Sequence, residues 1–241
     1  MHATGVAGFR PAAATGSTGL GSSTFMNSIA VIDYGMGNLR SVCKALEHVA
    51  PQARVMLTSS PEDVVRADRV VFPGQGAIGG CIAAMDQLNL RAVVLQAIET
   101  KPFLGICLGL QALFEFSEEG GGTPGLGVLP GKVPLFPRAQ MRDIRTGQTL
   151  KVPHMGWNQV HQVVAHPLWQ GIPQEARFYF VHSYYADAGD RQQVMGVTEY
   201  GIRFTSAAGR ENIFAVQFHP EKSQHVGLKL LENFVRWDGA A

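Results

Sequence analysis

The sequence predicts an α/β fold with a mostly parallel central sheet and helices on both faces. From residue 29 onward, short apolar runs rich in β-branched residues alternate with segments whose apolar residues recur at helical spacing. Gly, Pro and N-capping residues separate these segments. The chain has 241 residues, of which 46% are hydrophobic and only 16% charged, so it can bury a large core. Strands that alternate with helices usually pair in parallel, with the connecting helices packed against the sheet.

The first strand and the first helix are predicted at residues 29–33 and 39–49. The strand sequence IAVID is short and apolar, and the turn sequence GMGN follows it. Within the helix, Leu39, Val42 and Leu46 recur on one face. Asn38 directly precedes this helix and is its predicted N-cap.

Two further strands, at residues 53–57 and 69–72, are predicted on either side of a short helix that begins near Pro61. Ser60 is the predicted N-cap of this helix, and proline is common at the first helical position. The sequence PGQGAIGG, at residues 73–80, then interrupts the regular pattern because its glycines favour a turn.

The second half of the chain begins with an amphipathic helix, predicted at residues 89–100. A fourth strand follows at residues 102–107 and turns into a helix within LGLQALFEFS. Between residues 123 and 164, Pro and Gly separate short alternating runs, which predicts antiparallel strands or hairpins added to the main sheet. The apolar strand IFAVQF precedes a last helix at about residues 223–237.

The N-terminal segment, residues 1–27, differs from the rest of the chain. It consists mostly of Ala, Gly, Ser and Thr without periodicity, so we expect a disordered extension. It lacks the basic start and the continuous apolar stretch of a signal peptide. Because no repeat or linker follows, the sequence predicts a single domain at residues 28–241.

Composition narrows the possible partners. The formal net charge is +1, and Lys and Arg are spread along the chain, which argues against nucleic acid and membrane surfaces as partners. The longest apolar stretch, residues 103–114, is too short for a membrane helix. Three cysteines without a CxxC pair argue against a disulfide framework and favour a cytoplasmic location. His154, His161 and His166 lack metal-ligand spacing, so neither a metal nor another cofactor is predicted.

Cys107 is the predicted nucleophile. It lies in a Gly-x-Cys-x-Gly sequence where a strand turns into a helix. An ordinary thiol has a pKa of about 8.5, and a helix N-terminus favours its thiolate form. Gly105 and Gly109 leave room for the turn, and the backbone N–H of Leu108 would point to a developing oxyanion. The motif alone is also compatible with a buried core cysteine.

The sequence QFHPEKS, at residues 217–223, supplies the predicted base. Pro220 favours an extended conformation at His219, and residues two apart in an extended segment face the same side. His219 and Glu221 therefore point together. The imidazole would take the proton of a thiol and return it to a leaving amine, while the carboxylate orients the ring. Taken alone, the segment could also be an exposed loop with an incidental His and Glu.

FLGICLGLQALF followed by AVQFHPEKS resembles the class I, or triad, glutamine amidotransferases. The resemblance covers nearly all of residues 29–237. It implies a flavodoxin-like fold with an added antiparallel portion, and a catalytic triad of Cys107, His219 and Glu221. It also implies that L-glutamine is attacked at its side-chain amide, that ammonia leaves, and that a thioester on Cys107 is hydrolysed to glutamate.

Three further segments, DYGMGNL, KVPHMGWN and FVHSYY, resemble the glutaminase subunits of imidazole glycerol phosphate synthases, of histidine biosynthesis. KVPHMGWN is the most specific of them. This resemblance implies a heterodimer with a cyclase subunit, which uses the ammonia to form imidazole glycerol phosphate and aminoimidazole carboxamide ribotide. Because the sequence ends after the amidotransferase segment, we expect the cyclase to be a separate chain.

The resemblance also implies a glutamine site. Gln111 and Glu119 would hold the amino-acid end of glutamine, and a backbone N–H within PGQG would complete the oxyanion hole. Position 75 is Gln where relatives usually carry Val, but the implied donor belongs to the backbone. The implied glutamine-binding residues are Gly74, Gln75, Gly76, Leu108, Gln111, Glu119, His182, Ser183 and Tyr184.

The resemblance places four residues at the cyclase interface: Asn38, Trp157, Tyr179 and Lys222. The remaining cysteines, at positions 43 and 81, are predicted to pack in the core. Two other functions stay open at this point. One is a cysteine hydrolase of related architecture that acts alone on another amide or ester, and the other is a non-catalytic interaction subunit. The latter would normally have lost a triad residue, whereas this chain has all three.

Overall fold

The computed structural model describes residues 1–2, 27–37 and 39–240. The expected disorder of residues 1–27 falls almost entirely outside the described residues, and so does the predicted cap Asn38.

A central sheet of eight strands has the order β2-β1-β3-β4-β14-β13-β12-β9. Its parallel part has the strand order of a flavodoxin-like sheet. This part comprises β1 (Ser28–Ile32), β2 (Arg54–Thr58), β3 (Arg69–Gly74), β4 (Phe103–Cys107) and β14 (Ile213–Val216). Antiparallel strands extend the sheet beyond β14: β13 (Ile202–Arg210), β12 (Val194–Tyr200) and β9 (His161–Gln162).

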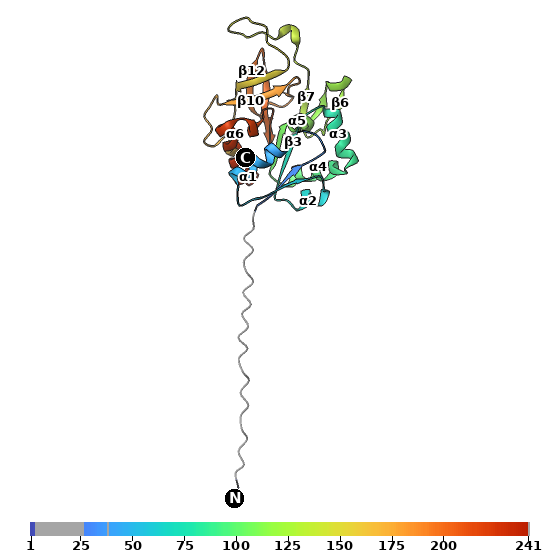
Figure 1. The fold of residues 1–241 in the computed structure, drawn as a ribbon, viewed down its shortest axis with the longest axis vertical. Coiled ribbons are helices and arrows are strands. Elements are labelled where there is room, and N and C mark those ends of the chain that lie inside the picture. The colour runs from blue at the N-terminus through green and yellow to red at the C-terminus, as the bar shows by residue number, and fades with distance from the viewer. Residues whose placement is uncertain (3–26, 38, 241) are drawn as a thin grey trace.

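Helices cover both faces of this sheet (Figure 1). One face carries α1 (Leu39–Val49) and α6 (Gln224–Arg236). The other carries α2 (Pro61–Arg66), α3 (Ile78–Gln87), α4 (Leu90–Thr100) and α5 (Leu108–Leu113). Successive side chains of β1 alternate between the two cores, with Val31 on the α1 and α6 side and Ile32 on the other. The predicted fold class is therefore confirmed.

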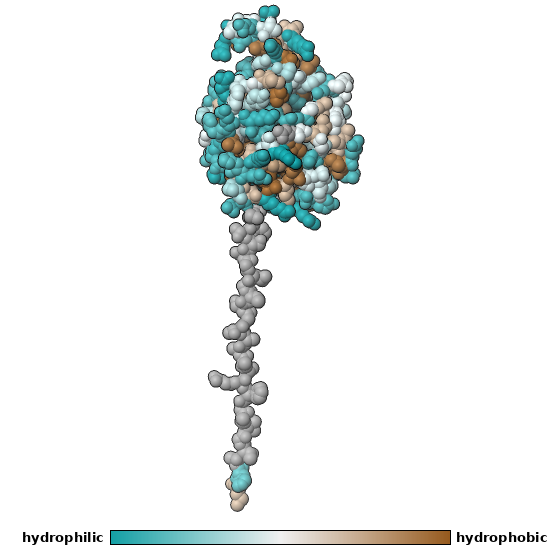
Figure 2. Space-filling view, viewed as in Figure 1, coloured by the Kyte–Doolittle hydropathy of each residue, from teal (hydrophilic) through white to brown (hydrophobic). Residues whose placement is uncertain are grey.

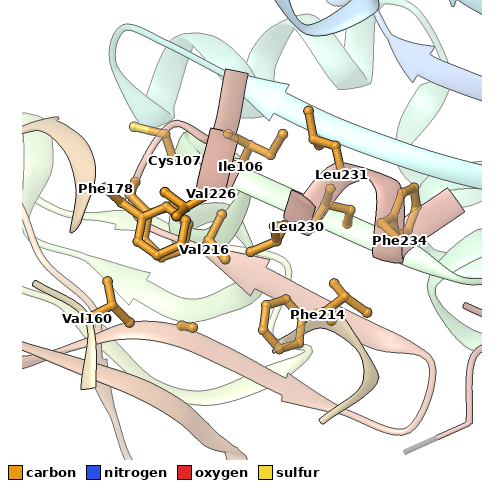
Figure 3. Close-up of a cluster of buried hydrophobic side chains, with 14 of the residues drawn as sticks. Ile106, Cys107, Val160, Phe178, Phe214, Val216, Val226, Leu230, Leu231 and Phe234 are labelled. Carbon is orange, nitrogen blue, oxygen red and sulfur yellow. The ribbon is translucent and has the colours of Figure 1, made fainter. Parts of the chain in front are cut away.

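The core on the α6 side reaches the nucleophile predicted from the sequence. Figure 3 shows Phe214 and Val216 of β14 close to Leu230 and Phe234 of α6. Cys107 lies at the edge of this buried cluster, at the end of β4. Each fully buried Phe or Leu contributes about 1.5–3 kcal/mol, so the end of β4 is held by a well-packed core.

Two smaller sheets lie beside the main one. The first has the order β11-β7-β5-β6, formed by β5 (Phe114–Ser117), β6 (Thr123–Pro124), β7 (Leu129–Val133) and β11 (Asp187–Ala188). The second pairs β8 (His154–Gln159) with β10 (Arg177–His182) in antiparallel register.

The structure corrects three interpretations of the sequence. PGQGAIGG does not only break the chain, because α3 begins inside it at Ile78, whose N–H donates to Glu119 Oε2 at 2.8 Å. The helix after Cys107 ends at Leu113, since the next residues pair with β6 and β7 as strand β5. The antiparallel extension of the main sheet comes mainly from β12 and β13, whereas residues 123–164 supply the smaller sheets and β9.

The face of the molecule in Figure 2 is mostly polar, with hydrophobic residues in small separate groups. Within the described part of the chain, no single helix is long and apolar enough to cross a membrane. Only α3 and α4 taken together have the length and apolar composition of a membrane-spanning helix, and they are bent by 101° relative to each other.

Candidate active site

The predicted catalytic segments meet at the carboxyl edge of the parallel strands. Cys107 ends β4, Gly74 ends β3, and these two residues are partners in the parallel register. The segment after β14 carries His219 and Glu221 to the same edge. Ligands of open α/β sheets bind outside this edge. The sheet topology therefore brings together segments that are more than a hundred residues apart in the sequence.

Cys107 occupies a strained turn between β4 and α5. Its φ of 56° and ψ of −105° are rarely adopted by non-glycine residues. The flanking glycines are required by packing: a Cβ on Gly109 would overlap the carbonyl oxygen of Phe72. A Cβ on Gly105 would lie 2.9 Å from that of Ala215. The strand-to-helix turn predicted from Gly-x-Cys-x-Gly is thus present, and it depends on both glycines.

Replacing Gly105 with alanine is expected to lower the free energy of unfolding by about 1–3 kcal/mol, the usual cost of overpacking. Gly79→Ala is the matched control, because its added Cβ would lie in α3 no closer than 3.7 Å to another group and alanine favours helix. Urea unfolding followed by circular dichroism measures both variants. Equal stability of the two variants would contradict the packing account of the turn.

His219 and Glu221 form a buried pair. His219 Nδ1 lies 2.9 Å from Glu221 Oε1, and their side chains are only 2% and 1% exposed. The His219 backbone is extended, and Pro220 begins the short 3₁₀ turn that follows. The His219 N–H donates to the carbonyl of Tyr179, and the Ser223 hydroxyl donates to the carbonyl of His219. His219 is therefore fixed both through its ring and through its backbone.

The charge state of His219 depends on its two neighbours. Burial by itself would lower the pKa of His219, but the Cys107 sulfur and then the Glu221 carboxylate raise it above its ordinary value. Nδ1 is taken by Glu221, and the buried Nε2 has no other protein partner among the described residues. The raised pKa favours the protonated form of the His219 ring, so the ring could accept a proton from a neighbouring group.

A cavity of about 390 Å³ opens beside Cys107 and His219. Its size suits a small ligand. Pro153 and Val181 contribute apolar walls. All residues implied as glutamine-binding line it except Gly74, which instead lies beside His219 and Glu221 in a small hollow. The implied residues that line the cavity are Gln75, Gly76, Leu108, Gln111, Glu119, His182, Ser183 and Tyr184.

Two polar side chains in the cavity wall are held by the fold. Gln111 Nε2 donates to the carbonyl of Tyr184 at 3.0 Å and to Gln217 Oε1 at 3.1 Å, so its own Oε1 remains available as an acceptor. Glu119 is held through one carboxylate oxygen by the N–H of Ile78 at the start of α3. An acceptor and a carboxylate that line the same cavity could bind an ammonium group.

A pair of buried, hydrogen-bonded histidines supports the part of the cavity wall that contains Tyr184. His182 Nδ1 lies 2.7 Å from the carbonyl of Tyr184 and therefore carries a proton that it donates. His182 Nε2 then accepts from His154 Nδ1 at 3.0 Å, and His154 Nε2 accepts from Asn158 at 3.3 Å. Burial lowers the pKa of His154 to about 4, and burial together with His154 lowers that of His182 to about 3. Both rings are neutral at pH 7.

These two histidines predict a loss of stability in mild acid. The unfolded chain, with ordinary histidine pKa values of about 6.5, binds more protons than the folded one between about pH 6.5 and pH 4. Their contribution is therefore complete above about pH 6.5 and decreases below it, by at most about 1.4 kcal/mol per pH unit for each ring. Urea unfolding at pH 7 and pH 5 should show a smaller loss in His154→Gln than in the control His161→Gln, whose ring is exposed. Equal losses of unfolding free energy in the two variants would contradict the lowered pKa of His154.

Two of the predicted interface residues, Tyr179 and Lys222, lie next to His219 and Glu221. Trp157 and Tyr179 are register partners on β8 and β10, with ring centroids 6.2 Å apart, and Trp157 is 39% exposed. Met155, on the same strand, is 62% exposed. Lys222 follows Glu221 directly and is half-buried. Asn38 lies outside the described residues.

Comparison with known proteins decides the family. Residues 30–237 match the family model "Glutamine amidotransferase class-I". The chain belongs to the class I glutamine amidotransferases. It is 59% identical over 212 residues to the "Imidazole glycerol phosphate synthase subunit HisH" of Aromatoleum aromaticum, covering 88% of this chain and 99% of the relative. The protein of the same name from Nitrosospira multiformis is 58% identical, with the same coverage.

Solved structures agree at the level of the fold. The amidotransferase resembles a "glutamine amidotransferase" crystal structure with a TM-score of 0.62 at 16% identity, over 86% of this chain and 98% of the other. A putative GMP synthase protein from Thermoplasma acidophilum gives a TM-score of 0.61 at 19% identity, over 88% and 93%. At such low identities the likeness concerns the fold alone.

The structure of this amidotransferase adds residues that sequence reasoning did not single out. Gln217 contacts Cys107, Ser223 contacts His219, and His154 supports the cavity wall. Gln217 could have been found from its position, two residues before His219 in an extended segment. Cys81 is fully buried and Cys43 half-buried; burial raises the pKa of both thiols, that of Cys81 to about 12, in accordance with the predicted packing roles.

Proposed function

We propose that this amidotransferase hydrolyses L-glutamine to glutamate and ammonia, and passes the ammonia to the cyclase subunit of imidazole glycerol phosphate synthase in histidine biosynthesis. The arrangement of Cys107 and His219 in the wall of a small-ligand cavity, with Glu221 paired to His219 behind it, carries the proposal. The partner and the pathway are supported by relatives of that name, which are 58–59% identical over nearly their whole length.

In the proposed reaction, Cys107 gives its thiol proton to His219 and attacks the side-chain amide carbon of glutamine. The tetrahedral oxyanion accepts hydrogen bonds from the backbone N–H of Leu108, which has no helical acceptor at the first position of α5, and from an N–H within residues 73–76. His219 protonates the amide nitrogen, which leaves as ammonia. It then deprotonates a water molecule that attacks the thioester, and glutamate is released with the thiol restored.

The cavity orients the substrate in this proposal. The free Oε1 of Gln111 and the carboxylate of Glu119 bind the α-ammonium group of glutamine. The segment from His182 to Tyr184 lies along the same cavity and binds the backbone end of the substrate. Gly74 and Gln75 contribute through their backbone at the end of β3. The amide of glutamine is thereby presented to Cys107.

The proposed cyclase-facing surface consists of Trp157, Tyr179 and Lys222, with Met155 as an exposed apolar neighbour. The backbone N–H of His219 donates a hydrogen bond to the carbonyl of Tyr179, so this surface lies next to His219. A cyclase bound there would be close to the point at which ammonia forms. The proposed compartment is the cytoplasm, because the nucleophile must remain a free thiol and all three cysteines are free.

Mixing the chain with a purified cyclase subunit tests the function and the surface together. Glutamate formation from glutamine should rise when the cyclase and its ribotide ligand are added. Trp157→Ala should weaken the complex by about tenfold, which corresponds to about 1.4 kcal/mol, because Trp is enriched among the few interface residues that carry most of the binding energy. Val65→Ala, at an exposed apolar position on α2, is the matched control. Glutaminase activity that no cyclase stimulates would point to a different triad glutaminase.

A further inference from the structure

The side chain of Gln217 approaches the nucleophile from a direction that the triad does not use. Gln217 is fully buried, and its Nε2 lies 3.8 Å from Cys107 Sγ. Its backbone N–H donates to the carbonyl of Ser206 on β13, which keeps the segment extended after β14. Alternation along that segment places Gln217 and His219 on one side and Phe218 in the core. The Cys107 sulfur therefore has two side-chain nitrogens as neighbours, one from Gln217 and one from His219.

A chain of hydrogen bonds fixes which end of the Gln217 amide faces the sulfur. The carbonyl of Tyr184 can only accept, so the Gln111 atom 3.0 Å from it is the amide nitrogen. The second hydrogen of that nitrogen needs an acceptor, and Gln217 Oε1 lies 3.1 Å away. With its oxygen engaged by Gln111, the Gln217 amide turns its NH₂ group toward Cys107. The orientation follows from a backbone carbonyl, which has no alternative assignment.

We infer that Gln217 is a further catalytic residue, whose side-chain amide donates a hydrogen bond to Cys107 Sγ and stabilises the thiolate that attacks the substrate. The inference rests on the proposed function of this site. A donor beside an ionisable group favours its charged form. No bond is made or broken by Gln217: the thiol proton goes to His219, and the amide compensates the negative charge that remains on sulfur.

The position of Gln217 also joins the nucleophile to the substrate site. Gln111, in the wall of the cavity, holds Gln217 Oε1, and Gln217 holds the sulfur. When the sulfur becomes part of a thioester it loses its negative charge and accepts hydrogen bonds weakly. The donor therefore favours the free thiolate over the acylated sulfur. It raises the fraction of Cys107 that is ionised before attack, and it stabilises the sulfur as the leaving group when water hydrolyses the thioester.

The pH dependence of Cys107 alkylation tests this inference. The full chain is treated with iodoacetamide between pH 5 and pH 10, and modification of the Cys107 peptide is followed by mass spectrometry. Gln217→Met keeps the length of the side chain but has no donor. The pH of half-maximal rate should rise by about one unit in this variant, which corresponds to an about tenfold lower rate below the midpoint. Gln96→Met, at an exposed position on α4, is the control and should match the unchanged chain.

A folded Gln217→Met chain, verified by circular dichroism, with the midpoint of the unchanged chain overturns the inference. If this variant does not fold, an NMR pH titration of the unchanged chain labelled with ¹⁵N tests the inference instead. The side-chain amide protons of Gln217 should then move downfield through the midpoint of Cys107 ionisation, but not in Cys107→Ser. Gln217 amide proton shifts that stay constant while Cys107 ionises also overturn the inference.

Alkylation requires neither glutamine nor a cyclase, so the two proposals can fail separately. If the alkylation profile shifts in Gln217→Met but the unchanged chain has no glutaminase activity, the role of Gln217 is supported and glutamine as the substrate is contradicted. Full glutaminase activity in Gln217→Met with an unshifted profile would retain the substrate and remove the role of Gln217.

Discussion

Replacing Cys107 with alanine is expected to abolish glutamate formation, by at least about 10⁴-fold, because no other described residue that lines the cavity has a thiol that could form the thioester. The complex with the cyclase should still convert its ribotide ligand when ammonia is supplied in the medium, since the cavity and the partner surface remain. Glutamate release and ammonia-dependent cyclase activity are measured on the same preparation.

Cys43→Ala is the matched control for this substitution, because Cys43 is a half-buried thiol on α1 and lies outside the cavity. Glutaminase activity should be unchanged in the control. A Cys107→Ala chain that still hydrolyses glutamine in the presence of the cyclase would remove Cys107 from the mechanism.

Glu221→Gln is expected to reduce glutaminase activity by roughly 10³- to 10⁴-fold. The substitution preserves the shape of the side chain but removes the carboxylate that orients His219 through Nδ1. Without that charge the pKa of His219 falls, and the ring becomes a poorer acceptor for the thiol proton. The loss should appear in kcat, because the carboxylate does not line the cavity in which we propose that glutamine binds.

Glu175→Gln is the control, because Glu175 forms an exposed pair with His161, 2.7 Å apart, where both side chains are about half exposed. Such surface pairs contribute little, so this variant should retain full activity. If Glu221→Gln were as active as Glu175→Gln, the carboxylate would have no part in the reaction.

The parts of the site that the sequence could predict are those determined by local structure. The turn at Cys107 follows from two glycines beside one cysteine, and the extended backbone at His219 follows from Pro220. Helix α1 follows from apolar residues at helical spacing, and the burial of the parallel strands follows from their short apolar runs. In each case the signal lies within about ten residues of the feature.

The features that the sequence could not predict depend on distant partners. Helix α3 begins where Glu119, far along the chain, accepts from the N–H of Ile78. His154 meets His182 only because β8 and β10 pair in one particular register. The position of Gln217, two residues before His219, can be read from the sequence. Its contact with Cys107 cannot, because it forms only where the ends of β4 and β14 lie side by side.

The most direct measurement of the central claim is the mapping of a covalent label. The diazo-ketone analogue of glutamine is incubated with the full chain and the cyclase subunit, and the labelled peptide is identified by mass spectrometry. We expect one label per chain on Cys107, none on Cys43 or Cys81, and protection by excess glutamine. Complete loss of glutaminase activity with the label on another residue and Cys107 unmodified would contradict the claim that Cys107 is the nucleophile.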